Sequence, residues 1–210
     1  MPRISGVSAR QAGPYTRIAY FFTRRSLARL TGRNPAAMLE PLEIYAHLPG
    51  LMRGYARLEQ ATAKLNRVDE RLRNLAELKA ATMVECEFCI DIGSQIARRS
   101  GLSDAQLLAL GSHQTSPLFS DLEKLVLDYS LELSRTPAKV SDTTFAGMRR
   151  HFDDAQLVEL THVIALESMR GRFNRAFGVG AAGFSKGRVC ALPASAAAVP
   201  AQRGRSSPAG

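Results

Sequence analysis

The sequence predicts an all-α protein, a helical bundle in which a Cys-x-x-Cys motif stands at the start of a central helix. Apolar residues recur at spacings of three and four through the middle of the 210-residue chain, which is the period of an amphipathic helix. Val, Ile and Thr never alternate with polar residues over the length of a strand. Helix-start signals precede the apolar stripes. Hydrophobic residues make up 45% of the chain, which is enough for an ordinary core.

The expected helices follow from these stripes, their start signals and the prolines between them. One stripe consists of Leu122, Leu125, Val126, Tyr129 and Leu133, and another begins with Leu157, Leu160 and Ile164. Three pairs have the spacing of a capping box, namely Ser103 with Gln106, Ser120 with Glu123, and Asp153 with Gln156. Breaks between helices are expected at Pro41, Pro49, Pro117 and Pro137. We therefore expect helices near residues 17–31, 51–63, 67–84, 86–100, 103–111, 119–134, 141–151 and 154–177.

Both ends of the chain are basic, and residues 1–14 and 186–210 are expected to lie outside the folded domain. Residues 1–33 hold seven Arg and no acid, and residues 186–210 hold four basic residues and no acid. The rest of the chain carries 17 basic against 19 acidic residues, so the net charge of +9 belongs to the ends and predicts no nucleic-acid partner. We expect a disordered N-terminus at 1–14, a helical domain at 15–185 and a disordered, low-complexity tail at 186–210.

The segment from Tyr15 to Leu30 is basic and amphipathic. It could be a surface helix drawn to anionic lipid. We favour a domain arm whose Tyr20, Phe21 and Leu27 pack on the core or on a neighbouring subunit. No stretch approaches the roughly 18 consecutive apolar residues of a spanning helix, and the first residues lack the apolar region of a secretory signal. We expect a cytoplasmic protein without stable membrane insertion.

The segment that carries chemistry is Val84-Glu85-Cys86-Glu87-Phe88-Cys89-Ile90-Asp91-Ile92-Gly93-Ser94. On a helix, both cysteines fall on one apolar, inward-facing stripe. A Cys-x-x-Cys pair in the first turn can close a short disulfide, and the free amides there stabilise a thiolate and lower its pKa. This favours two-electron thiol chemistry in which one sulfur attacks and its neighbour resolves.

Three other interpretations of the cysteines stay open. A thioredoxin-type oxidoreductase would need a βαβ context, which the pattern lacks. A zinc site would need two further ligands, and the remaining candidates are scattered along the chain at His113, His151, His162 and Cys190, so we expect no metal and no cofactor. The cysteines could also simply pack as small apolar residues, because Glu85, Glu87 and Asp91 would raise a nearby thiol pKa.

A family resemblance rests on residues 75–81 (LAELKAA), 86–94 (CEFCIDIGS) and 101–103 (GLS), and less specifically on residues 119–129 and 172–175 followed by Gly178. Here the chain resembles the carboxymuconolactone decarboxylase-like, or alkylhydroperoxidase (AhpD)-like, all-α proteins. The resemblance covers about residues 45–180, with the motif region at about 45–130. It implies a homo-oligomer with sites near subunit interfaces.

In the peroxidase members of this family, the second motif cysteine reduces the peroxide and the first resolves it as a disulfide, while a Glu and a His relay protons. The resemblance therefore implies Cys89 as the peroxidatic thiol and Cys86 as the resolving thiol. The Glu position holds Asn74 and the His position holds Gly93. The base that would form the thiolate and the acid that would protonate the leaving oxygen are both missing at those positions.

Other side chains are candidates for the proton relay. Glu77 lies one turn after Asn74 and Asp91 lies beside the motif, and either would need burial and a pKa raised toward neutrality. His113 or His162 would supply an imidazole if the fold brings it to the cysteines. Each has a structural alternative, an ion pair for the acids and a packing role for the histidines.

Two further features have both a structural and a functional interpretation. Gly93 either allows a close helix crossing or leaves space for a substrate above the thiols. On the last helix, Glu167, Arg170, Arg172 and Arg175 form ion pairs or subunit contacts, or one Arg meets an anionic substrate.

We interpret the sequence as an AhpD-like thiol peroxidase that acts on hydroperoxides and is reset by an external dithiol. The alternative is a non-redox small-molecule binding protein, or a lyase of the carboxymuconolactone decarboxylase type with a lactone-like substrate, that keeps the cysteines for packing. A third hypothesis is a redox-sensing protein whose disulfide alters oligomer contacts.

Overall fold

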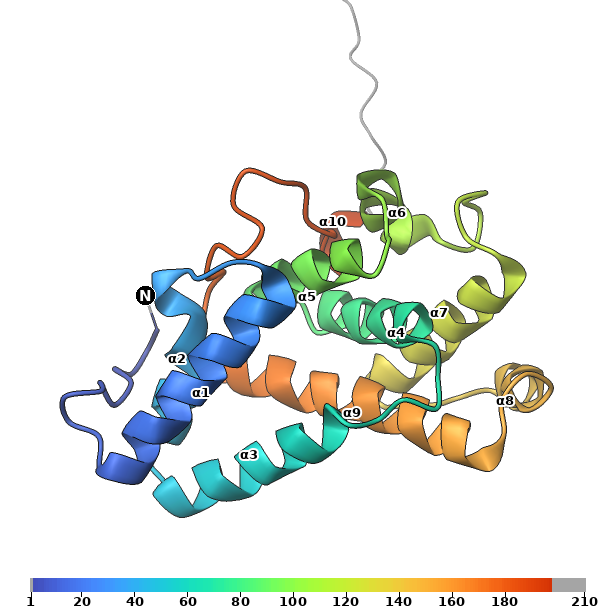
Figure 1. Cartoon of the computed structure of the whole chain (residues 1–210). Coiled ribbons are helices and arrows are strands. Elements are labelled where there is room, and N and C mark those ends of the chain that lie inside the picture. Colours follow the sequence, from blue (N-terminus) through green and yellow to red (C-terminus); the bar gives the residue numbers. More distant parts are fainter. Residues whose placement is uncertain (1, 198–210) are drawn as a thin grey trace, which may run out of the picture.

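The computed structural model describes residues 2–197, and its only regular elements within that range are helices (Figure 1). The long helices are α1 (Pro14–Thr31), α3 (Pro49–Thr62), α4 (Glu70–Met83), α5 (Glu87–Arg99), α7 (Asp121–Ser134), α8 (Asp142–Arg149) and α9 (Asp154–Phe177). The short ones are α2 (Glu40–Tyr45), α6 (Asp104–Ala109), α10 (Ala194–Ala197) and two 3-10 turns, η1 (Ala36–Leu39) and η2 (Leu110–Ser112). The predicted all-α class is confirmed.

All eight expected helices are present, with ends close to the expected residues. The three capping boxes form at Ser103, Ser120 and Asp153, each with its side chain and its third-next partner bonded reciprocally. Helix α2 was not expected, because Pro41 was interpreted as a break. Proline has no N–H to lose in the first turn of a helix, and Pro41 occupies that position of α2.

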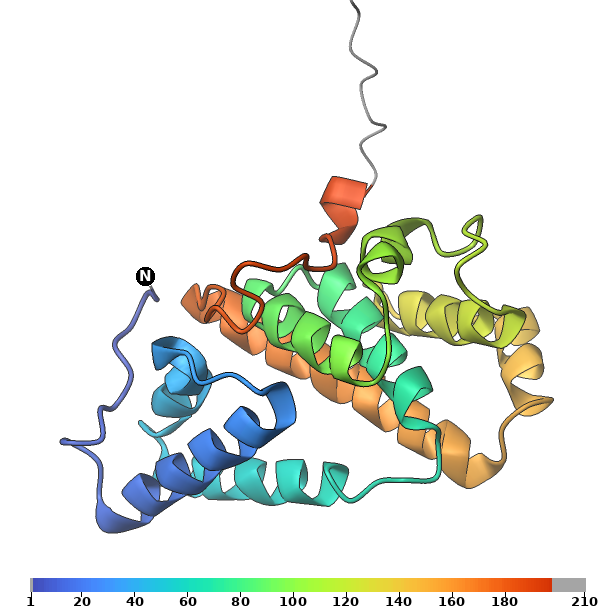
Figure 2. The ribbon, with the colours of Figure 1, turned by 45° about the horizontal axis from the view of Figure 1, so that its top comes forward.

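Helix α4 is the centre of the bundle. It packs against α5, α7 and α9, and Figure 2 shows α4 and α5 lying over the long α9. One face of α4 places Leu75 and Leu78 in the core cluster that also holds the motif cysteines. The other face places Ala76 and Ala80 in a second cluster with α7 and α9. The motif helix α5 packs on α4, α9 and α1 and is therefore held on several sides.

The N-terminal arm is partly as expected. Tyr20 is buried, and its hydroxyl donates to the carbonyl of Val7 at 2.8 Å. Leu27 is half-buried against the core, whereas Phe21 points away from it and is 63% exposed. The difference arises because adjacent residues on a helix face different directions, so Tyr20 and Phe21 cannot both reach the same core.

Residues of both segments expected to be disordered make backbone contacts with the helical domain within the described range. Arg3 N–H donates to the carbonyl of Phe177 at 2.6 Å, and Val7 N–H donates to that of Glu43 at 2.8 Å. In the expected tail, Ala191 is buried and its N–H donates to Ser94 Oγ at 3.0 Å. These backbone contacts order segments whose side chains alone predict no packing. The rest of the expected tail, from residue 198, lies outside the described residues.

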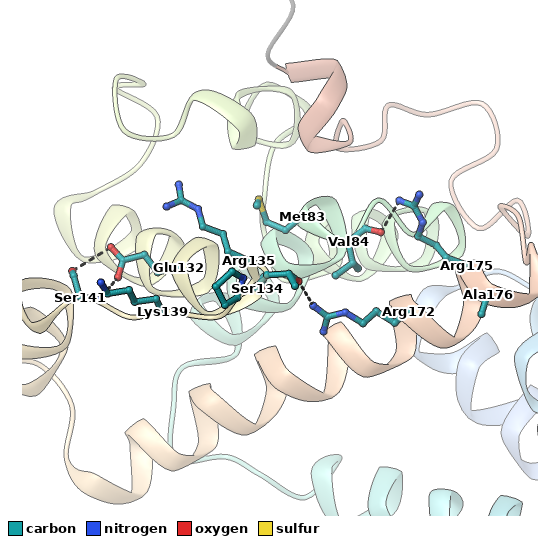
Figure 3. A pocket seen from close by; sticks show the side chains of 12 residues that line it. Met83, Val84, Glu132, Ser134, Arg135, Lys139, Ser141, Arg172, Arg175 and Ala176 are labelled. Carbon is teal, nitrogen blue, oxygen red and sulfur yellow. Dashed lines mark hydrogen bonds between the residues drawn. The ribbon is translucent and has the colours of Figure 1, made fainter.

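Within the described range, no helix is long and apolar enough to cross a lipid bilayer. An open pocket of about 980 Å³ lies between the end of α9 and the segment that joins α7 to α8 (Figure 3). Val84, in the turn that precedes the motif, lines this pocket.

Candidate functional site: the Cys86–Cys89 pair

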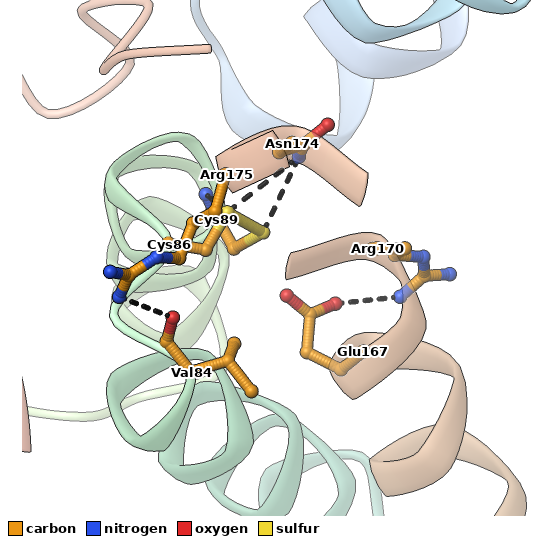
Figure 4. Close-up of a disulfide and its surroundings, with 7 residues drawn as sticks. All are labelled: Val84, Cys86, Cys89, Glu167, Arg170, Asn174 and Arg175. Atoms are coloured by element: carbon orange, nitrogen blue, oxygen red, sulfur yellow. Dashed lines mark hydrogen bonds and ion pairs between the residues drawn. A yellow bond between two sulfur atoms is a disulfide. The ribbon is translucent and has the colours of Figure 1, made fainter. Parts of the chain in front are cut away.

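The two motif cysteines are joined as a disulfide at the start of α5 (Figure 4). Their Cα atoms lie 5.2 Å apart. Cys86 is the N-cap of the helix, and its Sγ accepts the backbone N–H of Cys89 at 3.2 Å. Cys86 is fully buried and Cys89 is 5% exposed. The helix start therefore stabilises negative charge on Cys86, and both cysteines are buried.

Helix α9 covers the disulfide with a buried amide. Asn174 Nδ2 lies 3.6 Å from both Cys86 Sγ and Cys89 Sγ and donates to them. The helix can approach this closely because Gly171 has no side chain. A Cβ at Gly171 would collide with Val84 Cγ2 and lie 3.3 Å from Cys86 Cβ. The sulfurs are thus held between the start of α5 and a neutral donor from α9.

Sequence reasoning missed both Asn174 and Gly171 as parts of the site. A signal was available for Gly171, because a glycine inside a helix costs about 1 kcal/mol relative to alanine and usually has a packing reason. No local pattern marks Asn174, since its partners lie 85 and 88 residues away.

Glu85, the acid that precedes Cys86, is ion-paired. Glu85 adopts a left-handed backbone with φ of 52°, and its carboxylate accepts Ser195 N–H and Arg175 Nη1, each at 3.1 Å. These bonds, with that to Ser195 the largest cause, lower the pKa of Glu85. Arg175 Nη1 also donates to the carbonyl of Val84 at 3.0 Å. The carboxylate next to Cys86 is therefore partly neutralised by α9.

Asp91 has a structural role. Its carboxylate accepts the backbone N–H groups of Gly183, Phe184 and Ser185 at 2.7, 2.9 and 2.7 Å, and the residue is buried. These three bonds fasten the segment after α9 to α5.

A cluster of carboxylates surrounds Arg170 on α9, one turn before Asn174. Arg170 donates to Glu59 at 2.6 and 2.9 Å and to Glu167 at 2.9 Å, and Glu77 lies 4.0 Å from its Nη1. We call these four residues the acid cluster. In Figure 4 the carboxylate of Glu167 points into the space between α9 and the disulfide.

Burial governs the protonation of the acid cluster. It raises the pKa of Glu77 to about 7, against the attraction of Arg170, and the charge of Glu167 adds to the rise. Burial also raises the pKa of Glu167, again opposed by Arg170. Burial and the charge of Glu167 therefore both favour the protonated form of Glu77. The sequence singled out Glu77, and the structure adds Glu59, Glu167 and Arg170 around it.

The histidine candidates have other partners. His113 is buried, with Nε2 2.8 Å from Asp128 Oδ1 and Nδ1 3.2 Å from the carbonyl of Leu110. Burial lowers its pKa, although Asp128 opposes the change. His162 Nε2 bonds to Thr62 Oγ1 at 2.8 Å. Within residues 2–197, no hydrogen bond joins either ring to the sulfurs.

Gly93 lies at a close helix crossing. A Cβ at this position would lie 3.1 Å from Leu78 Cδ1, so the missing side chain lets α5 pack tightly on α4. The described residues contain no group of three His, Cys, Asp or Glu side chains that could hold a metal ion.

A protein-family model and a protein of another organism both match this chain in sequence. Residues 49–130 match the model of the carboxymuconolactone decarboxylase family. The uncharacterized protein YnjA of Escherichia coli (strain K12) is 40% identical over 131 residues, which are 62% of this chain and 69% of YnjA.

Two solved structures share the fold. The debrominase Bmp8 superposes with a TM-score of 0.72 at 18% identity, over 86% of this chain and 92% of Bmp8. An uncharacterized peroxidase-related protein from Ralstonia eutropha JMP134, described as an alkylhydroperoxidase AhpD core, superposes with a TM-score of 0.66 at 16% identity, over 85% of this chain and 90% of that one.

Proposed function

The chain belongs to the carboxymuconolactone decarboxylase family, and from this premise we propose that it is an AhpD-like thiol peroxidase. The observation that carries the proposal is the Cys86–Cys89 disulfide at the start of α5, with a buried amide donating to both sulfurs. Such a pair stores two electrons when reduced. The substrate class is a hydroperoxide, and the reductant is an external dithiol. The reducing cytoplasm that the sequence predicts would suit this cycle.

The proposed reaction has two steps. The Cys89 thiolate attacks one oxygen of the hydroperoxide, so that an S–O bond forms, the O–O bond breaks and the alcohol leaves after taking a proton. The Cys86 thiolate then attacks the sulfur of the sulfenic acid and forms the disulfide. The S–O bond breaks, and the departing hydroxide takes up a second proton and leaves as water. Two thiols are oxidised and one hydroperoxide is reduced to alcohol and water. The external dithiol restores both thiols by exchange.

The environments of the two sulfurs support these roles. Cys89 is the less buried of the two residues, which supports its role as the first to meet a small peroxide. Cys86 accepts the Cys89 N–H at the helix start, which stabilises it as a thiolate. A stabilised thiolate is a good nucleophile for the resolving step and a good leaving group when the external dithiol attacks Cys89. The amide of Asn174 supports negative charge on either sulfur.

We propose the acid cluster as the proton source that replaces the missing relay. Glu77 has a pKa raised to about 7, so near neutral pH it can give a proton to the departing alkoxide and take one back. Glu167 lies between Glu77's partner Arg170 and the disulfide, and it offers a path for the proton (Figure 4). Asp91 has no part in this proposal because its carboxylate is occupied by three backbone N–H groups of the segment after α9.

The test is oxidation of the fully reduced protein by tert-butyl hydroperoxide, followed by mass mapping of the cysteines. We expect an intramolecular Cys86–Cys89 disulfide and one equivalent of alcohol, and no reaction in Cys89→Ser. The matched control is Cys190→Ser, which removes the free cysteine outside the motif and should react like the wild type. Unmodified thiols in the presence of excess hydroperoxide would overturn the proposal.

A non-redox binding or lyase function is the second candidate. The residues at the two relay positions favour this candidate, because neither Asn74 nor Gly93 can transfer a proton. Within the described residues, the amide nitrogen of Asn74 also has no hydrogen-bond partner. This candidate predicts that Cys89→Ser keeps ligand binding or turnover of a lactone-like substrate. Loss of all activity in that variant would exclude it.

A halogenated aromatic is a second electrophile worth testing with the same thiols. Bmp8 is named a debrominase, and one of its structures is a complex with 2,3,4-tribromopyrrole. For this chain, the thiol pair would supply two electrons to replace a C–Br bond by C–H, releasing bromide and a proton and closing the disulfide. Release of bromide by the wild type, but not by Cys89→Ser, would extend the substrate class.

We also propose that the protein is a homo-oligomer. Helix α1 leaves large apolar side chains open to solvent, including Ile18, Phe21 and Phe22. Exposed apolar residues that lie together commonly mark a subunit contact. Light scattering should give a mass above the 22.9 kDa of one chain, and Phe21→Ser with Phe22→Ser should lower it.

A further inference from the structure

The pocket beside the motif has an unusual set of side chains. It encloses about 980 Å³ and is lined by the basic residues Arg135, Lys139, Arg172 and Arg175 (Figure 3). Arg135 and Lys139 come from the segment between α7 and α8, whereas Arg172 and Arg175 lie on α9. Two separate parts of the chain therefore bring positive charge to one concave surface. We call it the basic pocket.

Among the described residues, only Arg175 of these four has an ion pair, with Glu85 at 3.1 Å. Within residues 2–197, no carboxylate lies within 4.0 Å of the charged groups of Arg135, Lys139 or Arg172. Arg172 Nη2 donates to Thr136 Oγ1 at 3.0 Å, a neutral partner. The one acid that lines the pocket, Glu132, accepts Ser141 N–H at 2.7 Å and Thr144 Oγ1 at 2.8 Å.

The pocket is also lined by uncharged polar and apolar side chains. Ser134 is 4% exposed, and its hydroxyl has no hydrogen-bond partner among the described residues, although a buried hydroxyl is normally bonded. Met83, Val84 and Pro137 supply apolar surface beside it. A ligand that fits has an anionic group for the cations and a short apolar portion.

We propose that the basic pocket binds an amphipathic organic anion, a carboxylate with a short apolar chain. The guanidinium of Arg172 and the side chains of Arg135 and Lys139 hold the carboxylate, and the apolar chain lies along Met83 and Val84. The residues that line this pocket include neither Cys86 nor Cys89, so the site is distinct from the disulfide. The proposal concerns binding only, so it does not depend on the peroxidase cycle.

The test is titration calorimetry of the whole oxidised protein with octanoate as the probe. We expect saturable binding of one octanoate per chain, much weaker binding of acetate because it lacks the apolar chain, and none of octanol because it lacks the charge. Arg172→Gln should weaken octanoate binding about tenfold, since a hydrogen bond to a charged group is lost. Lys139→Gln, whose side chain has no ion pair within the described range, should weaken it about threefold.

The matched control is Arg25→Gln, which removes the same charge from the exposed surface of α1 and should leave binding unchanged. Unchanged thermal unfolding of each variant shows that the fold is intact. Equal binding of octanol and octanoate, equal binding by Arg172→Gln and the wild type, or no binding of octanoate would each overturn the proposal.

Discussion

The sulfurs of Cys86 and Cys89 contact the neutral amide of Asn174, whereas one turn earlier on α9 the acid cluster gathers three carboxylates around one guanidinium. Both regions include residues from the same stretch of α9. The cysteines and Asn174 are buried, whereas in the acid cluster Glu167 is buried and the other three residues are partly exposed. The difference separates two tasks that thiol chemistry needs. A nearby carboxylate charge would disfavour a thiolate, yet a proton donor must stand close to the reaction.

The largest effect is expected from removing Arg170, the cation that the three carboxylates share. Arg170→Met leaves Glu59, Glu77 and Glu167 without their counter-charge. We expect the free energy of unfolding to fall by about 3 kcal/mol at neutral pH, because buried carboxylates lose their partner. Urea denaturation measures the change. Arg57→Met, at an exposed position of α3, is the control and should change little.

The same variant should recover stability in acid, where the carboxylates bind protons. An equal loss at acidic and neutral pH would mean that Arg170 acts through packing and not through its charge.

The pH dependence of stability isolates Glu77. Its folded pKa of about 7 lies above the ordinary value of 4.5, so its contribution to the unfolding free energy is present below pH 4.5 and is lost as the pH rises through 7. Glu77→Gln should reduce the fall in stability between about pH 5 and about pH 8 by about 2 kcal/mol. The charged groups that face it are Glu59, Glu167, Arg170 and Arg73.

Kinetics give a second measurement on Glu77→Gln. If Glu77 supplies the proton, the wild-type peroxidase rate should fall above about pH 7, and the variant should be slower and lose this pH dependence. An unchanged pH profile would remove Glu77 from the mechanism while leaving the role of the cysteines intact.

The close contact of α9 with the motif depends on Gly171. Gly171→Ala gains about 1 kcal/mol of helix propensity but must push Val84 aside, and overpacking of this kind costs about 1–3 kcal/mol. We expect a net loss of about 1 kcal/mol. Gly54→Ala is the matched control, because it lies inside α3 with nothing within 4 Å of its Cβ position, and it should stabilise the protein. A stabilising Gly171→Ala would contradict the described packing.

The smallest effect is expected at Asn174. Asn174→Ala removes two weak hydrogen bonds to sulfur, so it should change the unfolding free energy by less than about 1 kcal/mol. It should raise the pKa of Cys89 in the reduced protein, which slows alkylation at neutral pH. Asn66→Ala, at an exposed position, serves as the control. Identical alkylation profiles would show that the amide does not support the thiolate.

The sequence predicted the helices well because their signals are local. Capping boxes and apolar stripes act within one turn or a few turns, and the helix of residues 154–177 has the expected ends. Helix α2 was missed because the same proline either starts a helix or breaks one, and the surrounding fold decides which.

The residues of the candidate site also divide into those that the local sequence predicts and those that only the fold brings together. The cysteines and Glu77 stand in one short segment of sequence, whereas Arg170 and Asn174 reach them only through the packing of α9. The sequence also suggested that the negative charges of Glu85 and Asp91 would raise the pKa of the thiols. Their partners Arg175 and Ser185, about 90 residues away along the chain, could not be known before the fold.

The most direct test of the account is a single-turnover titration of the reduced Cys190→Ser protein, which leaves only the two motif thiols. Thiols lost and tert-butyl hydroperoxide consumed are measured in the same sample. The account predicts two thiols lost for each hydroperoxide, a Cys86–Cys89 disulfide as the product, and full recovery of the thiols with dithiothreitol. Consumption of hydroperoxide with both thiols intact, or no consumption at all, would contradict it.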